Sequence, residues 1–142
     1  MIVVDVNLLL YAHFTAFPEH PRARDWWEGL VNGERAVGVA VPALFGFLRL
    51  ATSRRVFERP MSVEAAIGCS EAWMERPHVQ LLAPGPRHVQ IAFRLLRDVG
   101  AAGNLTTDVQ LAALAIEYQA ELHSNDPDFA RFSELRWVNP MS

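Results

Sequence analysis

The chain opens with the run IVVDV at residues 2–6, a β-branched apolar segment without polar alternation. A strand buried on both faces, as in a parallel sheet, has this character. Further short strands are expected along the chain, at residues 36–41, 79–82, 121–124 and 136–138. Longer segments with helical periodicity separate them, and this alternation is typical of βαβ units. The sequence therefore predicts an α/β fold with a mainly parallel sheet and helices on both of its faces.

Helix signals fill the segments between the strands. Asn7 is expected to cap the first helix and Ser62 the fourth, while Thr107 and Gln110 have the spacing of a capping box. The expected helices span residues 8–12, 21–31, 42–53, 62–75, 86–99 and 107–118, with a helical turn at 126–132. Trp26 and Trp27 point about 100° apart on their helix. One of them either faces a partner or joins a wide core-facing stripe.

Length and composition restrict the class of protein. With 142 residues, the chain is expected to form a single domain over residues 1–142. All 13 basic side chains are arginines, so mechanisms that need a lysine, such as Schiff-base chemistry or a P-loop, are excluded. The net charge of −3 argues against a broadly basic protein that coats nucleic acid.

Targeting signals are weak. The first 14 residues lack a basic start and carry Asp5 within their apolar run, which is unlike a signal peptide. Gly38, Pro42 and Gly46 interrupt the richest apolar stretch, which is too short for a membrane span. Cys69 is the only cysteine, which excludes an intrachain disulfide. We expect a cytoplasmic protein.

Polar side chains cluster just beyond the predicted strands. In open parallel sheets, ligands bind outside the carboxyl ends of the strands. Asp5 and Asn7 follow the first strand, and Ser124, Asn125 and Asp126 follow the fourth. These residues are therefore the first candidates for a binding or catalytic site.

Carboxylates dominate this candidate set. Asp5 lies among Ile and Val residues, and a buried carboxylate needs a strong partner, here Arg49 or a metal ion. Asp108 lies in the first turn of a predicted helix, and Asp126 and Asp128 share a polar loop. If they converge, the oxygen-rich site suits Mg²⁺ or Mn²⁺. The structural alternatives are that Asp108 caps its helix, that Asp126 and Asp128 shape an Asx-turn, and that Asp5 forms a salt bridge.

Four segments together resemble a known family. They are VVDVNLLLYA at residues 3–12, GFLRLAT at 46–52, TDVQLAALA at 107–115 and SNDPDF at 124–129. In this order they are similar to PIN-domain proteins, specifically VapC-type toxins of bacterial type II toxin–antitoxin systems. The resemblance covers nearly the whole chain.

The resemblance implies a three-layer α/β/α sandwich and a metal-dependent endoribonuclease that hydrolyses RNA phosphodiester bonds with Mg²⁺, for which Mn²⁺ substitutes. It also implies a cognate VapB-type antitoxin and a homodimer. The matching site positions are Asp5, Asp108 and Asp126 as catalytic and metal-binding carboxylates, Asp128 as a further metal ligand, and Asn7 and Ser124 as pocket residues.

One position departs from the family pattern. A glutamate is usual in the third helix, and Gly46 occupies the aligned position. The site then has one carboxylate fewer, which weakens metal affinity or leaves the position to water or Asp128. The alternative function is thus a PIN module that binds RNA or an antitoxin with weak or no catalysis.

Arginines supply candidate phosphate contacts. Arg49 follows Gly46 by one helical turn, where its guanidinium is expected to hold a phosphate or balance Asp5. Arg54, Arg55 and Arg59 cluster around Val56 and Phe57, a basic and aromatic strip that suits single-stranded RNA, although a solvated loop fits equally well.

A phosphatase of the haloacid-dehalogenase type is a third possibility, since it also has an aspartate after its first strand. The general acid expected two residues later is Asn7 here, and no lysine is present to orient a phosphate. Both absences disfavour this function.

Overall fold

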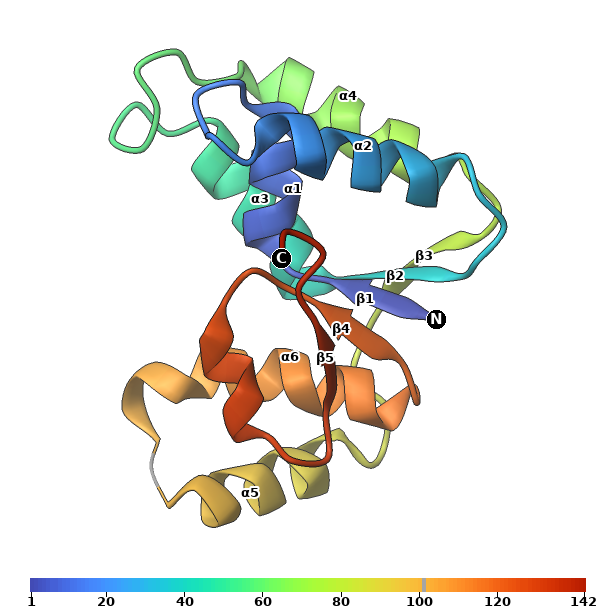
Figure 1. Cartoon of the computed structure of the whole chain (residues 1–142), viewed down its shortest axis with the longest axis vertical. Coiled ribbons are helices and arrows are strands. Elements are labelled where there is room, and N and C mark those ends of the chain that lie inside the picture. The colour runs from blue at the N-terminus through green and yellow to red at the C-terminus, as the bar shows by residue number, and fades with distance from the viewer. Residues whose placement is uncertain (101) are drawn as a thin grey trace.

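The computed structural model describes residues 1–100 and 102–142 (Figure 1). In chain order, the elements are β1 (Ile2–Val4), α1 (Val6–His13), α2 (His20–Val31), β2 (Val37–Ala40), α3 (Val41–Ala51), α4 (Val63–Met74), β3 (Val79–Leu82), α5 (His88–Val99), the 3₁₀ turn η1 (Gly103–Leu105), α6 (Thr106–Glu117), β4 (Glu121–His123), the 3₁₀ turn η2 (Pro127–Arg131) and β5 (Arg136–Val138). The predicted strands and helices are present, with bounds shifted by at most two residues.

The five strands form one sheet in the order β3-β2-β1-β4-β5. Every neighbouring pair is parallel; Val3, in the central strand, pairs with Gly38 on one side and Leu122 on the other. The prediction of a mainly parallel sheet is confirmed. Because all the strands point the same way, their carboxyl ends lie along one edge.

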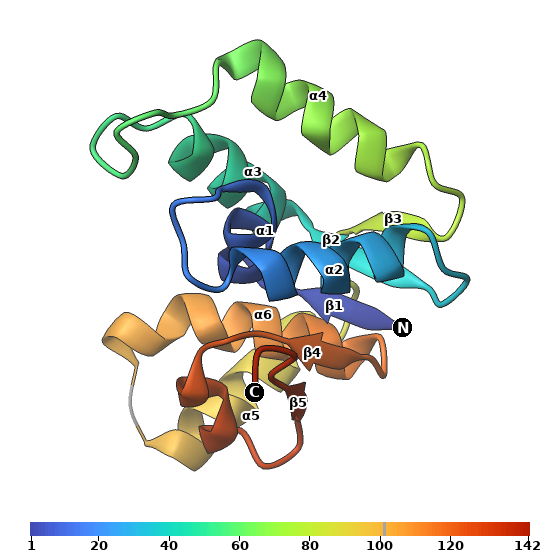
Figure 2. The same ribbon diagram turned by 45° about the horizontal axis from the view of Figure 1, so that its top comes forward.

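Helices cover both faces of the sheet, as Figures 1 and 2 show. Ile2 and Val4 pack into the core shared with α1 to α4, whereas Val3 packs into the core shared with α5 and α6. This alternation along one strand confirms the three-layer α/β/α sandwich. Within the described ranges, no helix is long and apolar enough to cross a bilayer.

The first helix begins immediately after the first strand. Asp5, not Asn7, is its N-cap, and Asp5 Oδ1 accepts a hydrogen bond of 2.7 Å from the Val6 N–H. The predicted cap was wrong because no loop separates β1 from α1, so the capping position falls two residues earlier. Asp5 is thereby fixed at the junction of strand and helix.

The sixth helix also begins differently from the prediction. Its N-cap position is Leu105, without a side-chain cap, so the capping box at Thr107 and Gln110 does not form. The 3₁₀ turn η1 runs directly into α6, and Thr106 Oγ1 donates to the Gly103 carbonyl. The predicted cap at Ser62 is confirmed, since its Oγ accepts from the Ala65 N–H at 3.1 Å.

Candidate active site

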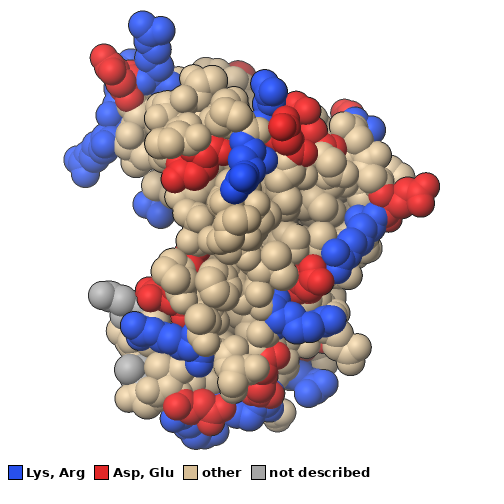
Figure 3. Space-filling model, in the orientation of Figure 1, with Lys and Arg blue, Asp and Glu red and all other residues tan. Residues whose placement is uncertain are grey.

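A hollow opens on the side of the molecule where the strands end. Figure 3 shows it at the left, between the half that contains α1 to α4 and the half that contains α5 and α6, with acidic atoms at its margin. At this edge of the sheet a pocket is lined by Asp5 after β1, Ala40 at the end of β2 and Asp108 in α6. The predicted site position is therefore also where the structure has a concave surface.

Three carboxylates converge at this edge. One oxygen from each of Asp108, Asp126 and Asp128 lies within 4.8 Å of the others. Asp108 comes from the first turn of α6, while Asp126 caps η2 and accepts a hydrogen bond of 2.9 Å from the Asp128 N–H. The predicted Asx-turn is therefore present, and it coexists with the clustering of the carboxylates.

Ser124 links the ends of the two central strands. Its Oγ is fully buried, donates to Asp5 Oδ2 at 2.6 Å, and accepts from the Asp126 N–H at 3.0 Å. Asn7 Nδ2 also donates to this Oγ, at 3.4 Å. The serine thus joins Asp5, at the junction of β1 and α1, to the loop that carries Asp126 and Asp128.

Arg49 does not balance Asp5. In the part of the chain that the structure describes, the polar partners of Asp5 are Ser124 and the Val6 N–H, and no ion pair involves Asp5. Arg49 lies in the last turn of α3 with its side chain exposed. The predicted salt bridge was wrong because short hydrogen bonds from the following helix and strand replace it.

Crowding of the carboxylates changes their protonation. Burial raises the pKa of Asp5, and the nearby Asp126 adds to this increase, against hydrogen bonds from Ser124 and Val6 that lower it. Burial, followed by the charges of Asp126, Asp5 and Asp128, raises the pKa of Asp108 to about 6. Like charges held this close destabilise one another unless a cation lies between them.

The donor set fits a hard divalent cation. Mg²⁺ and Mn²⁺ prefer carboxylate oxygens, and Mg²⁺ is commonly held by one or two of them. Asp108, Asp126 and Asp128 offer oxygens at compatible spacing, and burial together with the neighbouring carboxylates raises the pKa of Asp108. The cluster is therefore suited to bind such an ion.

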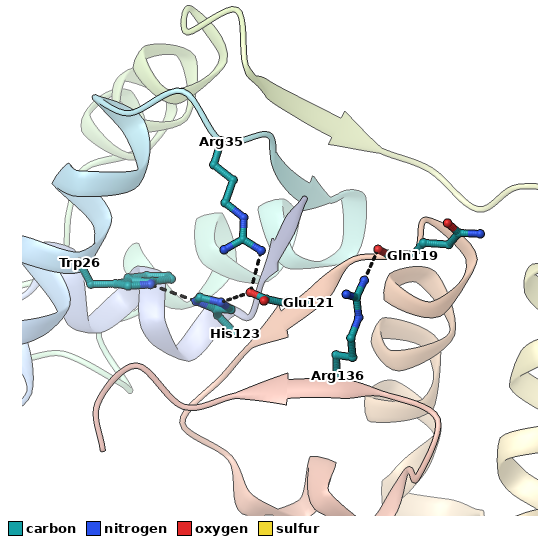
Figure 4. Close-up of polar contacts among 6 residues, drawn as sticks. All are labelled: Trp26, Arg35, Gln119, Glu121, His123 and Arg136. Carbon is teal, nitrogen blue, oxygen red and sulfur yellow. Dashed lines mark hydrogen bonds and ion pairs between the residues drawn. The ribbon is translucent and has the colours of Figure 1, made fainter.

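A second polar network supports β4 on the face covered by α2 (Figure 4). Trp26 Nε1 donates to His123 Nδ1 at 3.1 Å, and the opposite ring nitrogen of His123 lies 3.1 Å from Glu121 Oε2. Arg35 pairs with the same Glu121 oxygen at 3.0 Å. Trp26 thus covers His123, and Trp27 is buried. The wide core-facing stripe is the alternative that the structure supports for this pair.

The arginine strip after α3 is not formed as predicted. Phe57 is buried, with its ring stacked on that of Phe14 at a centroid distance of 3.8 Å. Its apolar face is therefore covered by protein and is not available to a base. Arg54 and Arg55 are exposed beyond the end of α3, in the loop at the upper left of Figure 1.

Several residues that line the pocket were not predicted as site residues from the sequence. Thr107, Gln110, Leu111 and Leu114 line the pocket from α6, and their helical spacing was a usable signal. His88, at the start of α5, also lines it, but nothing in its neighbourhood along the chain indicated this position.

Comparison with known proteins agrees with this architecture. A family model described as PIN domain matches residues 2–135. Ribonuclease VapC33 of Mycobacterium tuberculosis is 55% identical over 141 residues, which cover 99% of each chain. The structure of VapBC2 from Rickettsia felis, bound to a DNA fragment from its promoter, has a TM-score of 0.70 at 17% identity and covers 98% of each chain.

The structure of VapC20 from M. tuberculosis, described as a sarcin–ricin loop cleaving toxin, has a TM-score of 0.68 at 17% identity. It covers 96% of this chain and 99% of the VapC20 chain. At this identity the likeness supports the fold, whereas the match to VapC33 extends to the sequence of the whole chain. The chain therefore belongs to the PIN domain family, within its VapC group.

Proposed function

We propose that this chain is a divalent-metal-dependent endoribonuclease and the toxin of a type II toxin–antitoxin pair. The convergence of Asp108, Asp126 and Asp128 within 4.8 Å, beside Asp5 at the edge of a parallel sheet, is the observation that carries the proposal. The relative with 55% identity is named a ribonuclease, and VapC20 is described as a sarcin–ricin loop cleaving toxin. Both descriptions support hydrolysis of RNA phosphodiesters by this site.

Asp5, Asp108 and Asp126 are proposed as the catalytic residues, and these three with Asp128 as the residues that hold Mg²⁺ or, in its place, Mn²⁺. When bound, such an ion polarises water and neutralises the charge of a phosphodiester. Ser124 orients the carboxylate of Asp5 through its 2.6 Å hydrogen bond. The Asp108 carboxyl, with its pKa of about 6, takes up a proton in acid and then loses its ability to bind a cation.

Four residues are proposed to contact RNA. Asn7 lies beside Asp5, whereas Ser124, predicted as a further contact, is fully buried and is proposed to act only through its hydrogen bonds with Asp5 and Asn7. Arg49, Arg54 and Arg55 carry exposed guanidinium groups on α3 and the loop after it, where they suit the phosphates of a longer RNA.

The chain is proposed to act as a single domain over residues 1–142, to pair with a VapB-type antitoxin and to form a homodimer. Support for an antitoxin comes from the likeness to the VapBC2 structure, whose name combines VapB and VapC. Phe45 on α3 and Val89 and Phe93 on α5 are each more than half exposed, so both helices carry apolar side chains that a second chain could cover.

The presence of Gly46 is the reason for the alternative function, a PIN module that binds RNA or an antitoxin with weak or no catalysis. A Cβ at this position would lie 3.6 Å from Val6 Cγ2, an ordinary contact, so packing alone does not demand glycine. Gly46→Glu separates the two functions. A large gain in metal-dependent cleavage would favour the weakly catalytic module, whereas a loss would indicate a site already adapted to glycine.

The direct test is cleavage of a panel of structured RNAs by protein freed of any antitoxin, with Mg²⁺, Mn²⁺ or EDTA. Wild type is expected to cut at defined positions only with metal, Asp5→Ala to be inactive, and Asp98→Ala, an exposed change on α5, to match wild type. Equal cleavage by wild type and Asp5→Ala would reveal a contaminating nuclease. No cleavage by wild type would contradict the proposed activity.

A further inference from the structure

The pocket beside the carboxylates is more apolar than phosphate chemistry requires. Asp5 and Asp108 occupy part of its wall, and α6 adds the polar Thr107 and Gln110. Most of the remaining wall is apolar and comes from the start of α1, from β2 and β3 with the segments that follow them, and from α6. Its apolar members are Val6, Ala40, Pro42, Ala43, Leu82, Pro84, Leu111 and Leu114. Apolar walls with a few placed polar groups are typical of a site for a small organic ligand.

The wall formed by the β3–α5 loop is held in place by α6. Both Glu117 carboxylate oxygens accept backbone hydrogen bonds from this loop, Oε1 from Gly85 at 2.8 Å and Oε2 from Arg87 at 2.9 Å. Tyr118 donates its hydroxyl to the Ala83 carbonyl at 3.0 Å. A Cβ at Gly85 would lie only 2.6 Å from Glu117 Oε2, so a larger residue there would displace the Glu117 side chain from its present position. The pocket is therefore preformed, and a ligand would not have to order the loop.

His88 adds an unmet hydrogen-bonding group to the same wall. Its Nδ1 is buried and has no partner among the residues that the structure describes. A buried polar atom without a partner is costly, and a ligand that supplies one recovers that cost. His88 is thus a candidate to contact the ligand with its ring or, after a small rotation, with this nitrogen.

We propose that this pocket is a nucleobase subsite, which receives the base of a nucleotide adjacent to the scissile phosphate. The inference rests on the proposed function, because a phosphate at the carboxylates has a base one ribose away. The apolar walls match the faces of a base, and Thr107 and Gln110 match its polar edge. Asp5 and Asp108 disfavour an acidic side chain of a protein partner as the occupant of the pocket. Because Gln110 would contact the polar edge of the base, it is a specificity-determining residue.

The test measures binding without cleavage. The full chain is titrated, with Mg²⁺ present, with the 5′- and 3′-monophosphates of the four ribonucleosides and with ribose 5-phosphate, which lacks a base. At least one nucleotide is expected to bind about tenfold or more tightly than ribose 5-phosphate, the scale of stacking and edge contacts to one base. Equal affinity for all of these compounds would overturn the inference and leave an apolar side chain of a protein partner as the occupant.

Variants of the lining residues test whether the preference for nucleotides over ribose 5-phosphate arises in this pocket. Gln110→Leu removes the proposed edge contact and is expected to reduce discrimination among the four bases, while Thr107→Trp is expected to fill the pocket and abolish the advantage over ribose 5-phosphate. Gln90→Leu, the same change at an exposed position of α5 outside the pocket, is the control and is expected to match wild type. Unchanged base discrimination in both pocket variants would overturn the inference.

Cleavage of RNAs that differ only in the nucleotides flanking one cut separates this inference from the proposed function. Rates that are independent of both flanking bases, with cleavage still dependent on metal and Asp5, would overturn the subsite and leave the nuclease intact. Base-dependent binding of monophosphates without cleavage of any RNA would support the subsite and contradict the nuclease.

Discussion

The two halves of the acidic site are built in different ways. Asp5 is held by short hydrogen bonds from Ser124 and the Val6 N–H at the junction of a strand and a helix. Asp108, within the described residues, accepts no side-chain or backbone hydrogen bond at its carboxylate and faces the charges of Asp126, Asp5 and Asp128. One half is therefore preorganised by hydrogen bonds, whereas in the other half Asp108 lies among like charges without such bonds.

Asp126 belongs to both halves, because its N–H donates to Ser124 and its carboxylate lies in the acidic cluster. Loss of its charge should therefore have the largest effect on cleavage. Asp126→Asn keeps an oxygen for the Asp128 N–H but removes one negative charge from the cluster. We expect RNA cleavage to fall about a hundredfold or more, since loss of a supporting residue alone costs about 10–100-fold. The measurement is the rate of metal-dependent cleavage. Asp25→Asn, on the exposed side of α2, is the matched control, and comparable losses in both variants would contradict the role of Asp126.

Ser124→Ala should selectively disrupt the half of the site in which hydrogen bonds hold Asp5. The change leaves Asp5 Oδ2 and the Asp126 N–H without their buried partner, which is expected to cost about 1–3 kcal/mol of unfolding free energy. Urea unfolding measures this loss. Ser70→Ala removes a similarly buried hydroxyl that bonds only to the Ala66 carbonyl within α4, and it should cost less. Equal costs would show that the Asp5 half is not specially fixed.

Metal binding by the half of the site that contains Asp108 should depend on pH. Metal must displace any proton on Asp108, whose pKa is about 6 in the metal-free site. Binding of Mn²⁺ is therefore expected to be constant above about pH 7 and to weaken by up to about tenfold for each pH unit below 6. Titration calorimetry between pH 5 and 8 measures this slope. An affinity that is flat across this range would contradict the assignment of Asp108 as a ligand.

Asp108→Asn should stabilise the protein when no metal is present. The raised pKa means that the folded state binds a proton more tightly than the unfolded chain, so this contribution is favourable below about pH 4 and is lost as the pH rises through about 6. Because the side chain is partly exposed, we expect a gain of about 1 kcal/mol at pH 7.5 in EDTA. Thermal unfolding at pH 7.5 and pH 4 provides the check, and a gain that is equal at both would point to a cause other than charge.

The positions of the acidic residues could be predicted from the sequence with general rules. An aspartate at the end of a buried strand and a polar loop after another strand meet at one edge because the strands are parallel. Asp108 could be predicted to lie in a first helical turn from the helical pattern of its neighbours. These are properties of local sequence and of strand direction, both of which the amino-acid pattern reflects.

Contacts between distant side chains could not be predicted in this way. The sequence offered Arg49 as a charge partner for Asp5, whereas the structure supplies a serine hydroxyl from 119 residues away along the chain. Likewise, Phe57 among arginines suggested an exposed aromatic, but Phe14 stacks on it. Which of several compatible partners a buried group meets is decided by packing, and no spacing along the chain encodes it.

The placement of β1 at the centre of the sheet has a consequence for the time at which the site forms. β1 is synthesised before β4, yet its pairing with β4 and the bond from Ser124 to Asp5 require a segment 119 residues further along the chain. During synthesis, Asp5 leaves the ribosome long before Asp108, Asp126 or the strand that aligns them. A nascent chain therefore carries an incomplete carboxylate cluster until the segment with Asp126 and Asp128 has been synthesised.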